Sequence, residues 1–557
     1  MNKLIQHTRL FLLGSAFVMA SLVIVQSCCE VSLDGEAEKL ANQANEGCSA
    51  NHAQGKMSVV LSKKVENFEN STLLTTWNGA LKAFVKPQTL SIKSVDSATG
   101  ETDTVRFLEL DGKFAKGLGV TSRVFGTLFQ EGGKGSGLLG TSSISRMQEA
   151  LEVKAPPSDI ETRKFKRITA FDGMMSQLTG ELPQNGFSNL MADFDPTEQW
   201  SLDQARYDPA DAIKYFKDNA DPNRVVRVAV LDTGIDGNHP DLKDAIDASL
   251  AYNAITGKTG ISEVVDKEGH GTHVAGIIAG QGIGRTSGKT SANVLGVAGK
   301  FNVKIVPIKV LGDDGTGSTA AMSRGIRYAM QKGVDVISMS LGSGSNYDCL
   351  KSQSLSDPAV DDAIAKGIIV VSAAGNESCK LGGECKQQTQ NFTNYTVMPC
   401  AATNMACVGS NDYNEAASGF SNFANPDVTQ ADYRVAPDIV APGGRILSTF
   451  PTIAGFEDYE GVAILSGTSM ATPFVAGIAA ILKATEDKTK YPVNQEKFKA
   501  YLLEASYSND NYKTKFRTGR VDLKALAEYR QNKYIGGNAA YKAPTVPERK
   551  VTAFKYQ

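Results

Sequence analysis

The sequence predicts an α/β fold with a mainly parallel central sheet, and three apolar runs carry that prediction. Residues 225–231 (Val-Val-Arg-Val-Ala-Val-Leu) are almost unbroken in apolar character, which is typical of a strand buried on both faces of a parallel sheet. Residues 303–311 form a second run of this kind, and the small-residue run 474–482 indicates a buried helix. Strand and helix signals alternate from about residue 198 onward, as expected for an α/β domain.

Length and charge narrow the classes of protein that the chain can be. It has 557 residues, of which 41% are hydrophobic and 21% are charged, and its formal net charge is -2. This length allows a large core with appended segments. A net charge so close to zero gives no bulk attraction for a polyanion, so we expect no nucleic-acid partner.

Residues 1–27 have the three-part pattern of a secretory signal peptide. Lys3 and Arg9 supply the positive start, residues 11–25 are apolar, and a small residue then precedes Cys28. A cysteine at that point resembles a bacterial lipobox, which implies lipid attachment at Cys28 and retention on the cell membrane or outer membrane. An ordinary signal peptide, giving a secreted protein, and a single anchor helix are the alternatives. In each of these three cases the rest of the chain is exported.

The segment before the core is expected to consist of a tether, residues 28–56, and a separate region, residues 57–197. The second region contains strand-like runs such as residues 81–85 and 104–108, so we expect it to contain β-structure. It is either a propeptide that covers the active site and is later removed, or a permanent accessory domain. The sequence leaves both readings open.

Eight cysteines are present, and half of them cluster in one polar segment. The clustered residues are Cys379, Cys385, Cys400 and Cys407. In an oxidising compartment such a cluster predicts two disulfides that staple an insertion, with the pairing left open. Zinc is the alternative, although no tight Cys-x-x-Cys pair is present.

Three polar residues stand where α/β enzymes place chemistry. Asp232 follows the first buried strand, at the end where open sheets bind ligands, although a turn with a helix cap would also explain it. His270 opens a predicted helix; His273 shares its face, so zinc binding is an alternative, but no Glu stands beside the pair. Ser469 precedes the helix 474–482, where backbone N–H groups favour a developing negative charge, and an N-cap is the plainer explanation.

Asp232, His270 and Ser469, in this order and with the motifs around them, resemble the catalytic triad of the subtilisin-like serine proteases, or subtilases. Further stretches resemble family blocks in the same order: residues 303–311, 333–342, 368–377, 436–443 and 519–522. The resemblance covers residues 198–530 and implies a three-layer α/β/α catalytic domain with a mainly parallel central sheet. Residues 531–557 are then a C-terminal tail.

The resemblance implies an exported serine endopeptidase. His270 would take the hydroxyl proton of Ser469 as that serine attacks a peptide carbonyl, while Asp232 orients the imidazole. Asn376 and the Ser469 backbone N–H would bind the oxyanion. The chemistry requires no cofactor. A catalytically inactive binding lipoprotein on the same frame is the rival reading, and the presence of all four residues argues against it.

Protein or peptide substrates are expected to bind as an extended strand. The residues implied for substrate binding are Ser340, Leu341 and Gly342 on one side, Gly315 and Gly317 on the other, and Ala373, Ala374 and Gly375 in the pocket beside the cleaved bond. The small pocket residues leave room for a large apolar or aromatic side chain, so we expect broad specificity with a hydrophobic preference.

Two departures from the family pattern lead to further expectations. Asp241 resembles a calcium ligand of many relatives, but the partner loop, residues 281–293, is longer than usual, so calcium as a structural ion is left open. The insertion, residues 377–398, directly follows Asn376. We expect it to overhang the cleft and to shape specificity or autoinhibition.

Overall fold

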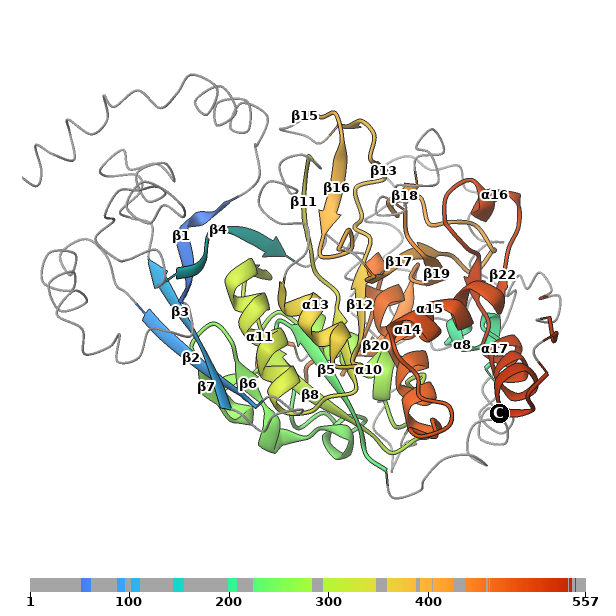
Figure 1. Cartoon of the computed structure of the whole chain (residues 1–557), viewed down its shortest axis with the longest axis horizontal. Helices are drawn as coiled ribbons and strands as arrows, with labels where there is room; N and C mark the ends of the chain where they lie inside the picture. The colour runs from blue at the N-terminus through green and yellow to red at the C-terminus, as the bar shows by residue number, and fades with distance from the viewer. Residues whose placement is uncertain are drawn as a thin grey trace, which may run out of the picture. The chain divides into compact units, whose positions relative to one another are not determined.

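Figure 1 shows the protein as a computed structural model of residues 1–557. The structure describes four strands before residue 199 by their backbone, and most of the chain from residue 199 to residue 546. Within that second stretch it leaves out residues 208–223, 283–293, 347–357, 387–390, 403, 425–435, 457–458, 460, 539 and 543–545. The predicted signal peptide and Cys28 lie outside the described residues. Among the helices that are described, none is long and apolar enough to cross a membrane.

The central sheet has ten strands in the order β22-β23-β19-β17-β12-β10-β5-β8-β6-β7. Only the outermost pairs, β22 with β23 and β6 with β7, are antiparallel. The strands are β5 (Val226–Asp232), β6 (Tyr252–Asn253), β7 (Lys258–Thr259), β8 (Val303–Lys309), β10 (Val336–Met339), β12 (Ile369–Ala373), β17 (Ala406–Asn411), β19 (Ile439–Pro442), β22 (Ser506–Tyr507) and β23 (Arg520–Val521). The predicted mainly parallel sheet is therefore confirmed.

Two helical layers cover this sheet, and β5 shows why its sequence is apolar throughout. Val228 and Val230 belong to one core cluster, whereas Ala229 and Leu231 belong to the other. The first cluster contains helices α10 (His270–Ala279), α14 (Thr468–Ala484), α15 (Gln495–Glu504) and α17 (Leu523–Tyr529). The second contains α11 (Thr319–Gln331) and α13 (Pro358–Ala365). A strand that alternates between two cores must be apolar on both faces, as the three-layer prediction requires.

Shorter elements complete the domain. Helix α8 (Trp200–Gln204) buries Trp200 in the first core cluster. The others are α16 (Asp510–Lys513), the short helices η5 (Lys243–Ala245), η6 (Ala248–Leu250) and η7 (Ile261–Glu263), and the π-helix η10 (Arg530–Ile535). Because η10 begins at Arg530, regular structure continues into the segment predicted as a C-terminal tail.

A second sheet lies in the N-terminal region, as the β-containing prediction expected. Its antiparallel strands are β1 (His52–Leu61), β2 (Gln88–Val95), β3 (Thr102–Leu110) and β4 (Ile144–Lys154), and the order β2-β3-β1-β4-β9 ends with β9 (Thr316–Ser318). The predicted strand 104–108 falls within β3, whereas residues 81–85 lie outside the described residues. Strand β1 begins at His52, inside the segment expected to be a tether.

The insertion after Asn376 contains paired strands, and two disulfides lie in and directly after it. Cys379 is bonded to Cys385, and Cys400 is bonded to Cys407, which answers the pairing that the sequence left open. The paired strands are β11 (Ser343–Asn346) with β16 (Tyr395–Met398), β13 (Lys380–Leu381) with β18 (Phe423–Ala424), and β14 (Cys385–Lys386) with β15 (Asn391–Phe392). A further hairpin, β20 (Ile446–Thr449) with β21 (Val462–Leu465), precedes α14.

Candidate active site

Asp232 and His270 form a buried hydrogen-bonded pair. Asp232 ends β5, and its Oδ1 lies 2.7 Å from Nδ1 of His270, the first residue of α10. The Thr233 N–H donates to the same oxygen at 2.8 Å. Asp232 is 1% exposed and His270 is 4% exposed. A carboxylate that accepts the Nδ1 proton leaves Nε2 as the basic nitrogen of the ring.

The carboxylate of Asp266 holds the start of α10 in place. It accepts hydrogen bonds from the N–H of Gly269 at 2.8 Å and from the N–H and hydroxyl of Thr272 at 2.8 and 2.7 Å. It also accepts a hydrogen bond from the Thr233 hydroxyl at 2.9 Å, which links the turn after β5 to the helix that carries His270. The sequence did not lead us to Asp266. The feature that could have indicated it is an acidic residue just before the start of a helix.

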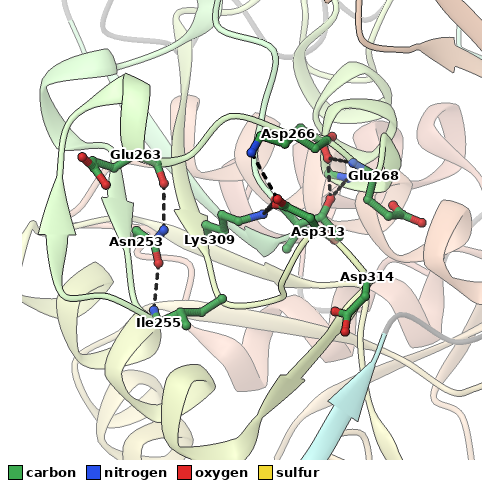
Figure 2. A network of polar contacts seen from close by, with 12 residues as sticks. Asn253, Ile255, Glu263, Asp266, Glu268, Lys309, Asp313 and Asp314 are labelled. Atoms are coloured by element: carbon green, nitrogen blue, oxygen red, sulfur yellow. Dashed lines mark hydrogen bonds and ion pairs between the residues drawn. The ribbon is translucent and has the colours of Figure 1, made fainter. Parts of the chain in front are cut away.

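Glu268 places a second carboxylate next to His270. Its Oε2 accepts the His270 backbone N–H at 2.8 Å, and its Oε1 lies 3.9 Å from where a Cβ on Gly315 would stand. Figure 2 shows its side chain extending away from Asp266, which lies on the same turn. No ion pair joins Glu268 to a cation among the residues that the structure describes. Burial raises the pKa of its carboxyl group.

These carboxylates decide the charge of the His270 imidazole. Burial disfavours the imidazolium, but the negative charges of Asp232, Glu268 and Asp266, with the Asp232 hydrogen bond, outweigh it. They raise the pKa of His270 to about 9. A base with a raised pKa accepts a proton more readily, whereas a larger fraction of it is already protonated at neutral pH.

His273 lies behind the site and has a different environment. Its Nε2 is 3.1 Å from the carbonyl oxygens of Ile446 and Ala463, in β20 and β21. Burial lowers the pKa of His273 to about 3, so the ring is neutral and donates to these carbonyls. Such contacts link α10 to the hairpin and do not favour the zinc alternative. No group of three or more His, Cys, Asp or Glu side chains suited to a metal occurs in the described part of the chain.

Ser469 lies in the first turn of α14, which packs against both α10 and β5. It is 0% exposed, and its Oγ lies 3.4 Å from the Ser340 carbonyl oxygen. The Ser340 hydroxyl in turn donates to the Ser469 carbonyl at 2.8 Å. Nε2 of His270 has no hydrogen-bond partner among the described residues. Catalytic hydrogen bonds often form only when substrate is bound, so this geometry is compatible with a serine–histidine pair.

Asn376 is oriented by the residue that precedes Ser469. Its Oδ1 accepts both the N–H and the hydroxyl of Thr468, each at 2.8 Å. The amide nitrogen is therefore the end that faces Gly467, where a Cβ would stand 3.0 Å from it. A side-chain N–H group is thus aimed at the N-terminus of α14, beside the backbone N–H of Ser469. Two such donors can stabilise an oxyanion.

Comparisons with known proteins agree with this geometry. Residues 223–529 match the model of the Subtilase family, Peptidase S8. The chain belongs to the subtilase family. It is 35% identical over 317 residues to the major intracellular serine protease of Bacillus subtilis strain 168, across 56% of this chain and 86% of that protein. It is 34% identical over 303 residues to subtilisin DY of Bacillus licheniformis, across 54% of this chain and 91% of that protein. These relatives identify this subtilase as a serine-type peptidase.

A solved structure shows the same fold over a longer stretch. The epidermin leader peptide processing serine protease of Staphylococcus aureus aligns with 88% of this chain and 99% of its own, at 19% identity and a TM-score of 0.51. A mutant form of the same protease aligns with 85% of this chain at a TM-score of 0.52. At this level of identity the likeness concerns the fold alone.

One of the two edges expected to bind substrate is already paired in this subtilase. Strand β9 contains Gly317 and follows Gly315, and β4 of the N-terminal region lies antiparallel to it. The register places Val153 opposite Gly317 and Lys154 opposite Thr316. Strand β4 also lies close to β11, which follows the second expected edge, Ser340–Gly342. A backbone segment of the same chain thus lies along the edge that we expected to bind an extended peptide.

The proposed pocket residues sit at the end of β12. Ala373 and Ala374 are fully buried, and Ala374 packs against the Cys400–Cys407 disulfide. Because β12 pairs in parallel with β10, the segment from Ala373 to Gly375 runs beside the edge from Ser340 to Gly342. The structure therefore brings both sets of predicted residues to the same end of the sheet.

Asp241 lies at the base of the loop for which calcium was considered. It is buried, and its Oδ2 accepts the Val294 N–H at 3.1 Å. Residues 283–293 lie outside the described residues. The Asp241 carboxylate is already engaged with the backbone, and by itself it does not make a calcium site. Calcium binding stays a prediction.

Proposed function

We propose that this subtilase is an exported serine endopeptidase that hydrolyses peptide bonds through an acyl-enzyme on Ser469. The 2.7 Å hydrogen bond between Asp232 Oδ1 and His270 Nδ1 carries the proposal, because it pairs a buried base with a carboxylate. Both groups lie beside helix α14, whose first turn contains Ser469. The four residues that the chemistry requires come from β5, α10, α14 and the end of β12. No observation favours the rival reading of an inactive binding lipoprotein.

Each proton in the proposed reaction is carried by His270. Its Nε2 accepts the Ser469 hydroxyl proton as Oγ attacks the substrate carbonyl carbon, and Asp232 stabilises the imidazolium that forms. The C–N bond then breaks, the imidazolium protonates the leaving amine, and an ester remains on Ser469. Water enters, gives a proton to His270 and attacks the ester. The acid product leaves as the proton returns to Ser469.

The oxyanion of each tetrahedral intermediate would be bound by the Ser469 N–H and the Asn376 side-chain amide. Thr468 prearranges the second donor by holding the Asn376 oxygen in two hydrogen bonds. Donors that are already aligned need no reorganisation when the charge develops, and their effect is strong in a site that excludes water.

Export is supported by the two disulfides in and after the insertion. Cys379–Cys385 and Cys400–Cys407 are of the kind that persists in oxidising compartments and is rare in the cytosol. We propose that the signal segment directs the protein out of the cytosol and that Cys28 carries a lipid which retains it on a membrane. A protein released after ordinary signal cleavage is the alternative.

We further propose that the N-terminal region acts as an intramolecular propeptide inhibitor. Strand β4 supports this reading because it pairs with β9 at the edge where substrate would add a strand. The N-terminal strands also contact α11 of the catalytic domain. A strand that fills this edge competes with substrate for the same backbone hydrogen bonds.

The proposed chemistry predicts the effect of removing one oxygen atom. Ser469→Ala should lower kcat on an unfolded protein substrate by about a million-fold, the size of loss known for the serine of subtilisin. Ser249→Ala, which removes a hydroxyl in η6, is the matched control and should keep full activity. Release of soluble peptides by the processed protein measures both. Undiminished hydrolysis by Ser469→Ala would contradict the proposal.

A further inference from the structure

Two adjacent strands of the central sheet lead into the place where the side chain before the cleaved bond would sit. Strands β10 and β12 are paired through Met339 and Ser372, and their continuations carry Gly342 and Gly375. We call the space between these two glycines the primary pocket. Its role rests on the proposed function, because that function places the substrate edge on one side and the pocket wall on the other.

One side chain from the insertion bridges the two walls of the primary pocket. Cγ1 of Val397 lies 2.7 Å from where a Cβ on Gly342 would stand, and its Cγ2 lies 3.2 Å from where a Cβ on Gly375 would stand. Val397 is 3% exposed. The two methyl groups of one residue thus contact both walls, so the isopropyl group occupies volume between them.

The insertion fixes Val397 in this position. Strand β16 pairs with β11, and the register places Val397 opposite Gly344. Val397 also belongs to the small core of the insertion, together with Cys379, Leu381, Cys385, Phe392 and Tyr395. The Cys379–Cys385 disulfide closes that core. Moving Val397 aside would break this packing and the β11–β16 ladder, so the pocket cannot deepen at low cost.

We propose that Val397 shortens the primary pocket, so that this subtilase prefers a small aliphatic residue, such as alanine, before the cleaved bond. The proposed preference is still hydrophobic, but it is for a small side chain and not for the large apolar or aromatic side chain that we expected from the sequence. That expectation came from Ala373, Ala374 and Gly375, which are small. The residue that fills the space comes from another segment of the chain.

A carboxylate on the same wall requires a control substrate. Oε2 of Glu377 lies 2.5 Å from where a Cβ on Gly375 would stand, and it accepts a hydrogen bond from Nδ2 of Asn422 at 2.5 Å. Val397 contacts the same glycine, so a lysine before the cleaved bond would meet both the isopropyl group and this carboxylate at one wall. The substrate series therefore includes lysine as well as apolar side chains.

The experiment measures kcat/KM for peptides that differ only in this residue: Ala, Val, Leu, Phe and Lys. The processed wild-type enzyme should cleave the Ala peptide best and the Phe and Lys peptides poorly. Val397→Ala should raise the Phe-to-Ala ratio by about 10- to 200-fold, the range that pocket volume supports. Val397→Thr, which keeps the volume, should leave the ratio unchanged.

The matched control is Val462→Ala, because Val462 is similarly buried, 4% exposed, and packs in a separate cluster with Val294 and Leu447. It should leave the ratio at the wild-type value. A wild-type preference for Phe or Lys would overturn the proposal, as would a ratio unchanged in Val397→Ala. If Val397→Ala does not fold, the wild-type ranking of the five peptides still decides. Failure to cleave any peptide would instead contradict the proposed function, and this inference with it.

Discussion

His270 is surrounded by more negative charge than the Asp232 carboxylate alone provides. Glu268 accepts the His270 backbone N–H and stands beside Gly315, at the edge where substrate would bind. The carboxylate of Asp266 lies on the same turn. Each of them favours the imidazolium, which forms during both halves of the proposed reaction. Ionisation of this one side chain should therefore control the pH dependence of the enzyme.

The first prediction concerns that pH dependence. Only the neutral imidazole can accept the Ser469 proton, so kcat/KM should rise as pH increases through the His270 pKa of about 9. Glu268→Gln removes a charge that favours the imidazolium and should therefore lower this pKa. The rising limb of the pH profile then moves to lower pH.

Asp313→Asn is the control for this prediction, because Asp313 is already paired with Lys309 at 3.0 Å and Lys267 at 3.3 Å. Its loss should move the profile much less. Profiles of kcat/KM against pH for the three proteins measure the effect. An unmoved limb in Glu268→Gln, or one at higher pH, would show that Glu268 does not act on His270.

Sequence motifs were enough to predict the residues proposed to react, but not those that hold them. Asp232, His270 and Ser469 stand in short motifs at the ends of strands or at helix starts. Asp266 acts by accepting hydrogen bonds from residues that meet only after folding. Val397 acts through a strand pairing whose register no local pattern determines. Roles that depend on non-local contacts are not visible in a single sequence.

At the scale of elements, the insertion connects the segment after β12 with strand β11. Its strand β16 pairs with β11, which directly follows the expected substrate edge. In the sequence, one disulfide precedes β16 and the other follows it. The sequence predicted the parallel sheet from its apolar runs, and it predicted two disulfides from the cysteine cluster. It could not predict the pairing, because four cysteines allow several connectivities.

The second prediction concerns the Cys379–Cys385 disulfide. Cys379→Ser/Cys385→Ser should lower the free energy of unfolding by about 2 kcal/mol, as expected for opening so short a loop. It should also raise the Phe-to-Ala ratio of kcat/KM, because the small core that positions Val397 loosens. Thermal unfolding and the peptide series measure the two effects.

The same double substitution in a Val397→Ala background is the control. The pocket is then already open, so the ratio should change little further, while the loss of stability should persist. A ratio that is unaffected by removing the disulfide in the wild-type background would show that the insertion does not depend on this bond to position Val397.

At the scale of the whole molecule, the catalytic domain and the N-terminal sheet share a strand junction. Residues 50–557 form one compact unit, and β4 joins the N-terminal sheet to β9 of the catalytic domain. The sequence placed β-structure before the core but left open whether it is a propeptide or an accessory domain. The pairing of β4 with β9 is the main reason to prefer the propeptide.

The third prediction concerns the mature N-terminus. If the N-terminal region is a propeptide, the active form should begin after Lys154, the last residue of β4, and no later than about residue 200, where α8 begins. N-terminal sequencing of the active protein measures this. Adding the separate segment 50–154 should inhibit that form. An active protein that retains β4 would instead make the region a permanent domain.

The central claim is that Ser469 is a nucleophile activated by His270 and Asp232. A fluorophosphonate probe tests it most directly, because the probe forms a stable bond only with an activated serine. The processed protein should gain the mass of one adduct, peptide mapping should place it on Ser469, and Ser469→Ala should gain none. No adduct on the fully processed protein, or an adduct on another residue, would contradict the claim.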